Sequence, residues 1–561
     1  MNAPSAQRID LRTALSVLGL AFVFDRLFWR QDIGLDLALF TVVAMGGALA
    51  LRRSASVPAR WVLGGLMICA TMVVVNGSVI AVVGTVACLA VGAVLLLEPA
   101  QRNLPVALVA AMFNALFAPI GVAGALNTGL TRLPATRTGW RWTRLALIPL
   151  AVLLVYIFIY RAANPRFEAL TAGFMDGLID LLGDLLGELV TPHVLFIGFA
   201  LLVSVALLHR SAPHLFAGAA WPLNETLTRI RRRRPHWLAP LAMGALDRER
   251  RMGVMLLVLV NALLLVVNLI DIAWVWAGFT VEEGFDLKQF VHEGTWLLIL
   301  SILLSMAILL HLFRGNLNFH PKQSTLRMLA TAWIAQNFIL GVSVFLRNYH
   351  YIHFHGLAYK RIGVIVFLAL MLVGLVTLYL KVRGQRTLVY LLRVNGWAAF
   401  VALVGLSTVN WDGVIVRFNL AHWNQGEIDV DNYLAMSDKV LPLLYADLPK
   451  VEAQMAKHRG NRVRWVEHLD PQGFRADLDR KRERFIRRYL KQDWRSWTLA
   501  DQRTFEALEA RHLATAVPRE ERARRAPADA ASEAVAARTA ETLATMADEG
   551  ASNAVVEAEA H

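Results

Sequence analysis

Apolar runs long enough to cross a membrane recur from Leu11 to Val409, and they constrain the fold more than any other feature of the sequence. The hydrocarbon core of a bilayer is about 30 Å thick, so a spanning helix needs roughly 20 largely apolar residues. Of the 561 residues, 56% are hydrophobic and 18% are charged, and the mean hydropathy is +0.47. This apolar excess predicts an all-α, polytopic transmembrane helix bundle, for which the lipid bilayer is the first partner.

The apolar runs predict eleven spans. They cover residues 11–24, 33–51, 61–76, 78–97, 145–162, 189–208, 252–277, 295–313, 328–346, 362–380 and 388–409. A further segment, 104–126, is apolar but contains Asn114, Pro119 and several glycines. It either crosses, which gives twelve spans, or dips in and returns where protein shields its backbone.

Lys and Arg in short loops mark the cytoplasmic side of a membrane protein. The basic loops are Arg52 to Arg60, Arg132 to Arg144, Arg210 to Arg251 and Lys381 to Arg386. They share one side only if 104–126 does not cross, which is the interpretation we favour, or if one of the earlier apolar runs is not a span. The opposite side then receives a His-rich loop, Arg347 to Arg361, and the chain after Val409. We therefore expect a bacterial inner-membrane protein with a periplasmic C-terminal domain.

The composition changes after Val409 and predicts three parts. Residues 1–409 form the transmembrane domain, and 410–511 form a small helical soluble domain because mixed charge alternates with apolar residues at helical spacing. Residues 512–561 are rich in Ala, Glu and Arg with almost no aromatic residues, which is typical of a disordered tail. The net charge of +14 lies in the inter-span loops and the C-terminal third, so it indicates membrane orientation and no nucleic-acid partner.

No catalytic motif is present: the sequence has no phosphate loop, dinucleotide fingerprint, zinc-protease helix or nucleophile elbow. We accordingly expect no catalytic residues and no cofactor. His350, His353 and His355 could bind zinc or copper, but their spacing matches no metal signature, and ordinary interfacial residues are the favoured interpretation. No metal site is predicted. Cys69 and Cys88 each lie inside an apolar run and indicate helix packing.

Several polar residues fall inside predicted spans. Asn261, Asn268 and Asp271 share one helix face, and Gln336 and Asn337 lie near the middle of another run. Such groups either form hydrogen bonds between helices, the favoured interpretation, or line a path for a solute or ion.

Short motifs across residues 150–445 resemble a bacterial family of multi-pass membrane proteins of unknown function, DUF4173, and the related family DUF4153. The motifs are Asn268 to Asp271, Val291 to Trp296, Ala335 to Asn337 with Arg347 and Arg361, and Asn410 to Asp412 continuing to Pro442. The resemblance implies a membrane fold and no activity. The candidate functional residues are Asn268, Asp271, His292, Glu293, Gln336, Asn337, Arg347, Arg361, Asn410, Asp412, Arg417 and Asn419.

We expect a non-enzymatic envelope scaffold, sensor or assembly partner, with Asn410 to Pro442 either contacting an envelope protein or closing over the bundle as a lid. The main alternative is a small-solute or ion transporter, which would need broken helices or ionisable groups that converge within the membrane. A membrane-embedded transferase that uses outer-loop histidines and carboxylates is a third possibility, and it lacks a motif.

Overall fold

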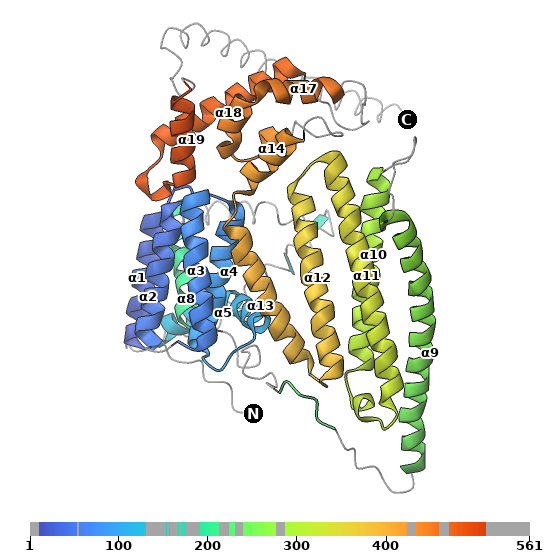
Figure 1. The fold of residues 1–561 in the computed structure, drawn as a ribbon. Coiled ribbons are helices and arrows are strands. Elements are labelled where there is room, and N and C mark those ends of the chain that lie inside the picture. Colours follow the sequence, from blue (N-terminus) through green and yellow to red (C-terminus); the bar gives the residue numbers. More distant parts are fainter. Residues whose placement is uncertain are drawn as a thin grey trace, which may run out of the picture.

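The computed structural model describes residues 10–52, 55–130, 191–211, 224–229, 239–276, 287–422, 432–458 and 470–511, with a few single residues between 153 and 173. Within these residues every long element is a helix, which confirms the all-α fold (Figure 1). Nine of the described helices are long and apolar enough to cross a membrane. The predicted span 145–162 and the tail 512–561 lie almost wholly outside the described residues.

A first group of membrane helices is formed by the N-terminal part of the chain. It consists of α1 (Leu11–Phe28), α2 (Leu35–Arg52), α3 (Val57–Asn76), α4 (Val79–Leu97) and α8 (Pro192–Leu208). The helix starts carry side-chain caps: Ser56, Ser78 and Thr191 each accept a backbone N–H of the first turn. Gly77, with φ of 53°, ends α3 and turns the chain directly into α4.

A second group follows later in the chain. It consists of α9 (Ala239–Asp271) with the π-helical turn η3 (Ile272–Trp276), α10 (Leu287–Leu312), α11 (Gln323–His355) and α12 (Tyr359–Arg383). Its apolar core includes Leu257, Ile302, Leu326 and Leu368, all fully buried. One expectation was wrong here: Arg347 to His355 belongs to α11 and is not a loop. The helix continues past its apolar run because Arg347 finds a carboxylate partner inside the group.

One helix joins the two groups. α13 (Leu388–Ser407) packs against α12 on one side and against α3, α4 and α5 (Leu104–Leu130) on the other. Figure 1 shows it running obliquely between them. Most of its residues are half-buried, because it lies between the two groups and inside neither.

α5 contains the segment 104–126, for which the sequence left open whether it crosses the membrane. It is one continuous helix through Pro119, so it does not dip in and return. The Asn103 side chain before it donates to the carbonyl of Val389 at the start of α13, and Asn114 donates to the carbonyls of Ala206 and His209 at the end of α8. Both contacts lie at the same end of the bundle. Leu104–Ala123 is also one of the nine helices long and apolar enough to cross, so the expectation that α5 does not cross stays a prediction.

The described parts of the basic loops meet at this same end. Arg210 pairs with Glu98 at 3.4 Å, and Arg393 of α13 pairs with Glu225 at 2.9 Å. The backbones of Leu227 and Gln385 are hydrogen-bonded to each other. Two of the loops that the sequence assigned to the cytoplasm, Arg210 to Arg251 and Lys381 to Arg386, thus meet in their described parts.

The C-terminal helices cover the opposite end of the bundle (Figure 1). They are α14 (Trp411–Ala421), α15 (Asn432–Ala435), η5 (Asp438–Val440), α16 (Leu441–Ala446), α17 (Leu448–His458), α18 (Pro471–Lys491), η6 (Trp494–Ser496) and α19 (Leu499–Glu509). They share an apolar core around Tyr433, Phe474 and Phe485. Ile362 of α12 belongs to this core, so the C-terminal helices are docked on the membrane helices.

Candidate functional site

The candidate residues fall into two places. One is the interface of α9 and α11, and the other is the junction between α14 and the ends of the membrane helices. We call the second place the Asp412 junction; it consists of Tyr359, Asp412, Ser437, Lys439 and Asn76.

A chain of amides runs along the α9–α11 interface. The Gln336 amide nitrogen donates to the side-chain oxygen of Asn261 at 2.9 Å, and the Asn268 amide nitrogen donates to the backbone carbonyl of Gln336 at 3.0 Å. Asn261 also donates to the carbonyl of Leu329 on α11 at 3.1 Å. The amides therefore tie the two helices together at several heights, as expected of interhelical hydrogen bonds.

Asp271 and Arg347 form a buried ion pair at the end of this interface. A guanidinium nitrogen of Arg347 lies 2.5 Å from a carboxylate oxygen of Asp271, and the side chains are 9% and 5% exposed. Gly294 of α10 lies against the same guanidinium. A Cβ at that glycine would be only 3.3 Å from a guanidinium nitrogen. Three helices thus enclose the pair. The π-helical turn η3 begins at the residue after Asp271.

Arg361 and Asn419 organise the turn between α11 and α12. The Arg361 guanidinium donates to the carbonyls of His355 and Gly356, groups that the end of a helix leaves without partners. Asn419 of α14 accepts the backbone N–H of Leu357 at 2.6 Å and donates to its carbonyl at 3.0 Å. Both candidates therefore act on backbone, and Asn419 fastens α14 to the turn.

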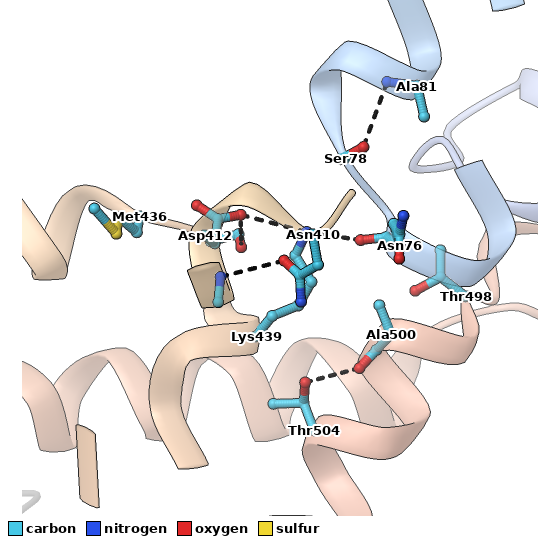
Figure 2. Close-up of polar contacts among 12 residues, drawn as sticks. Asn76, Ser78, Ala81, Asn410, Asp412, Met436, Lys439, Thr498, Ala500 and Thr504 are labelled. Atoms are coloured by element: carbon cyan, nitrogen blue, oxygen red, sulfur yellow. Dashed lines mark hydrogen bonds and ion pairs between the residues drawn. The ribbon is translucent and has the colours of Figure 1, made fainter. Parts of the chain in front are cut away.

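Asp412 lies at the centre of the second place, in the first turn of α14 (Figure 2). One carboxylate oxygen accepts the hydroxyl of Tyr359 at the start of α12. The other accepts the hydroxyl of Ser437 at 2.5 Å and lies 3.3 Å from the ammonium nitrogen of Lys439. Asn410 caps the same turn by accepting the N–H of Gly413. The carboxylate is thus held by three side chains, one from the start of α12 and two from η5 and its N-cap.

Lys439 extends this network into the first helix group. Its ammonium donates to the carbonyl of Asn76, the last residue of α3, at 2.6 Å. The Asn76 side chain in turn donates to the carbonyls of Ser407 and Thr408 at the end of α13. A cation at a helix C-terminus is electrostatically favourable. The Asp412 junction therefore connects α12, α14, α3 and α13.

Burial and hydrogen bonding shift the pKa of Asp412 in opposite directions. Burial alone would raise the pKa of its carboxyl, but the hydrogen bonds from Ser437 and Tyr359 and the nearby Lys439 ammonium outweigh burial, so the pKa is lowered. The carboxylate is consequently charged at neutral pH.

Other candidates are not brought together. The Asn337 side chain donates only within its own helix, to the carbonyl of Trp333, and Arg417 is exposed on α14. His292 and Glu293 lie on α10, but their side chains are outside the described residues. His350, His353 and His355 lie on the last turns of α11. Among the described side chains, no three His, Cys, Asp or Glu residues are grouped as a metal would require.

Sequence reasoning missed three members of the Asp412 junction. Tyr359 and Lys439 stand at helix starts, where hydroxyl and ammonium groups are usually solvated, and Asn76 ends an apolar run. Nothing in their local pattern indicates that residues so far apart in sequence meet. Ser437 and Lys439 did lie within a segment that carried the family resemblance, but the resemblance assigned neither of them a contact with Asp412.

One family model matches the chain: Domain of unknown function (DUF4153), over residues 40–446. The chain belongs to this family. The match covers the second helix group, α13, α14 and the first group except α1 and the start of α2, so the DUF4153 region includes the α9–α11 interface and the whole Asp412 junction. No curated protein and no solved structure matches the chain.

Proposed function

We propose that this DUF4153 protein is a non-enzymatic scaffold or sensor of the bacterial inner membrane, whose C-terminal helices hold the two helix groups in one relative position. The Asp412 junction carries the proposal. Lys439 and Asp412 are buried and fully engaged, and the network reaches both groups. A satisfied buried network favours one arrangement of its elements, whereas loss of one member leaves a buried charge without compensation.

The roles of the other candidates support a positional function. Arg361 caps α11, Asn410 caps α14, and Asn419 clamps the turn at Leu357. The described parts of Asn410 to Pro442 contact the protein's own helix ends, which supports the lid interpretation. An envelope protein partner would then bind the outer surface of the C-terminal helices.

Distance measurements between the two groups test the scaffold. Spin labels at Val57 of α3 and Met328 of α11, which are 60% and 65% exposed at the far end of the bundle, report the relative position of the groups. We expect one narrow distance distribution for the parent protein and a broad one for Lys439→Met. Lys450→Met is the matched control, because Lys450 pairs on the surface with Asp447. An unchanged distribution in Lys439→Met would refute the proposal.

The periplasmic position of the C-terminal helices is supported by the basic loops at the opposite end. Reporter fusions after Val409 should therefore give a periplasmic signal. A cytoplasmic signal would reverse the orientation and would place any partner of the C-terminal helices in the cytoplasm.

A solute or ion transporter is the second candidate. Asp271 is an ionisable group buried among membrane helices, and the π-helical turn that follows it is a feature frequently found at functional sites. Asp271→Asn with Arg347→Gln separates the two functions. A transporter should lose its solute-dependent phenotype even when the double variant is fully folded, whereas a scaffold with a packed ion pair should retain function.

A further inference from the structure

We propose that the C-terminal end of α18 and the turn after it bind anionic phospholipid headgroups of the adjacent leaflet. The surface consists of Arg484, Arg487, Leu490, Lys491 and Trp494, and we call it the α18 end. The inference does not depend on the scaffold proposal, because it concerns a different face of the C-terminal helices.

The position of the α18 end is fixed by backbone contacts to the membrane helices. The N–H of Leu35, the first residue of α2, donates to the carbonyl of Trp497 at 3.1 Å. The Arg495 guanidinium donates to the carbonyl of Arg26 near the end of α1 at 2.5 Å. Gly34 approaches the Ser496 carbonyl so closely that a Cβ would lie 2.3 Å from its oxygen. Trp494 therefore stands where the spans end and headgroups begin.

The side chains at this position have the character of an interface. Trp494 is 63% exposed and Leu490 is 64% exposed, a large apolar surface for a segment that would otherwise face water. Arg487 and Lys491 are exposed beside them on the same helical face. Tryptophan is enriched at the level of the headgroups, and clustered Lys and Arg next to a membrane are attracted to anionic lipids.

Charge pairing differs among the basic residues of α18. Arg488, in the last turns, points to the other C-terminal helices and pairs with Asp438 and Asp501. Arg475 pairs with Glu452 and Arg480 pairs with Asp477 in the half farther from α1 and α2. Arg484, Arg487 and Lys491, in the last two turns, form no ion pair among the described residues. The helix dipole favours cations in a last turn, but it explains neither the exposed Leu490 nor Trp494. A lipid surface explains all of them.

The first experiment measures how deeply the α18 end lies in the membrane. A spin label at Leu490→Cys, in vesicles of phosphatidylcholine and phosphatidylglycerol, should be accessible to oxygen and shielded from a water-soluble nickel chelate. The label at Arg480→Cys, on the same helix and 72% exposed, should show the opposite. Equal access of the nickel chelate to both labels would overturn the proposal. Two other results would also overturn it. Spin–spin broadening that disappears on dilution with unlabelled protein would assign the surface to a second copy of the chain. Loss of the shielding from the nickel chelate on removal of residues 512–561 would assign the surface to that segment.

The second experiment measures how much the basic side chains of the α18 end contribute to the affinity for anionic lipid. An environment-sensitive fluorophore at Leu490→Cys in detergent is titrated with a short-chain phosphatidylglycerol. Arg487→Gln with Lys491→Gln should weaken the apparent affinity by about fivefold for each charge removed. Arg475→Gln with Arg480→Gln, which removes the same charge elsewhere on α18, should leave the affinity nearly unchanged. Equal effects of the two pairs, an equal response to phosphatidylcholine, or a response to inorganic phosphate alone would contradict the proposal.

Discussion

The two helix groups differ in what holds their helices together. Where the first group and α5 meet α13, small residues allow close approach: a Cβ at Gly65 of α3 would lie 2.4 Å from Phe400, and a Cβ at Gly396 of α13 would lie 2.2 Å from Pro105 of α5. In the second group, polar side chains cross between α9 and α11, from Asn261 to the Asp271 ion pair. Both solutions occur among membrane helices, because lipid removes the hydrophobic drive for helices to associate.

The two helix groups differ in whether they bury an ion pair between their helices. Close packing of small residues depends on shape and carries no charge, whereas the Asp271–Arg347 pair places two ionisable groups under the C-terminal helices. Buried ionisable groups are costly unless paired. The first group has a polar contact as well, between Asp25 of α1 and His193 of α8 at 2.7 Å, but the His193 side chain is 44% exposed, whereas the second group encloses its ion pair between helices.

The largest expected effect comes from breaking the buried pair. Asp271→Asn should destabilise the protein by about 3–5 kcal/mol, because it leaves the Arg347 guanidinium buried without its carboxylate. Thermal unfolding in detergent, followed by loss of monodisperse protein, measures the change. The double variant Asp271→Asn with Arg347→Gln should recover most of the stability. If the double variant is as unstable as the sum of the single variants, the pair is not the unit that holds α9 to α11.

The second prediction concerns Asp412, which couples the groups. Asp412→Asn should cost about 2 kcal/mol at neutral pH, the scale of hydrogen bonds to a charged group. Since the pKa of Asp412 is lowered on folding from an ordinary value of 3.8, the stability that it contributes is present above that value and is lost as pH falls through the folded-state pKa. The gap between parent and variant should thus be constant from neutral pH to about 5 and should close in stronger acid. A gap that grows in acid would contradict this assignment.

The helical membrane fold could be predicted because lipid imposes a span length that apolar runs reveal directly. The ends of helices were less predictable: α11 runs to His355 because Arg347 is satisfied by Asp271 from another helix, and Gly356 then stops it. From the sequence alone, an arginine after an apolar run predicts the end of a span. Here the helix continues because Arg347 is paired with Asp271 of another helix.

The α9–α11 interface was predicted in part, since period and depth placed Asn261, Asn268 and Asp271 on one face. The Asp412 junction was not predicted as a site, although Asp412 itself was selected. Its partners Tyr359, Lys439 and Asn76 lie 53, 27 and 336 positions away by the numbering of the chain, and only the docking of α14 on the bundle brings them together. Local pattern carries no information on such contacts.

The third prediction tests the close packing attributed to small residues. Gly396→Ala should destabilise the protein by about 1–3 kcal/mol, because the added methyl group meets the rigid ring of Pro105. Gly405→Ala is the matched control on the same helix, with no atom within 4 Å of the added Cβ, and it should be neutral or slightly stabilising. Thermal unfolding of both variants makes the comparison. Equal stabilities would show that α13 and α5 adjust freely.

The smallest expected effect comes from a single amide in the second group. Gln336→Leu removes the hydrogen bond to Asn261 and should cost roughly 0.6 kcal/mol, with an upper limit near 1.7 kcal/mol, as measured for hydrogen bonds between membrane helices. The cost is small because the Asn261 amide nitrogen keeps its bonds to the carbonyls of Leu257 and Leu329. A double-mutant cycle with Asn261→Leu isolates the coupling between the two amides. Asn337→Leu, whose bond stays within α11, is the control for polarity alone. A coupling near zero would leave the Asp271–Arg347 pair as the main polar contact of the second group, and the contrast between the two groups would then rest on that ion pair.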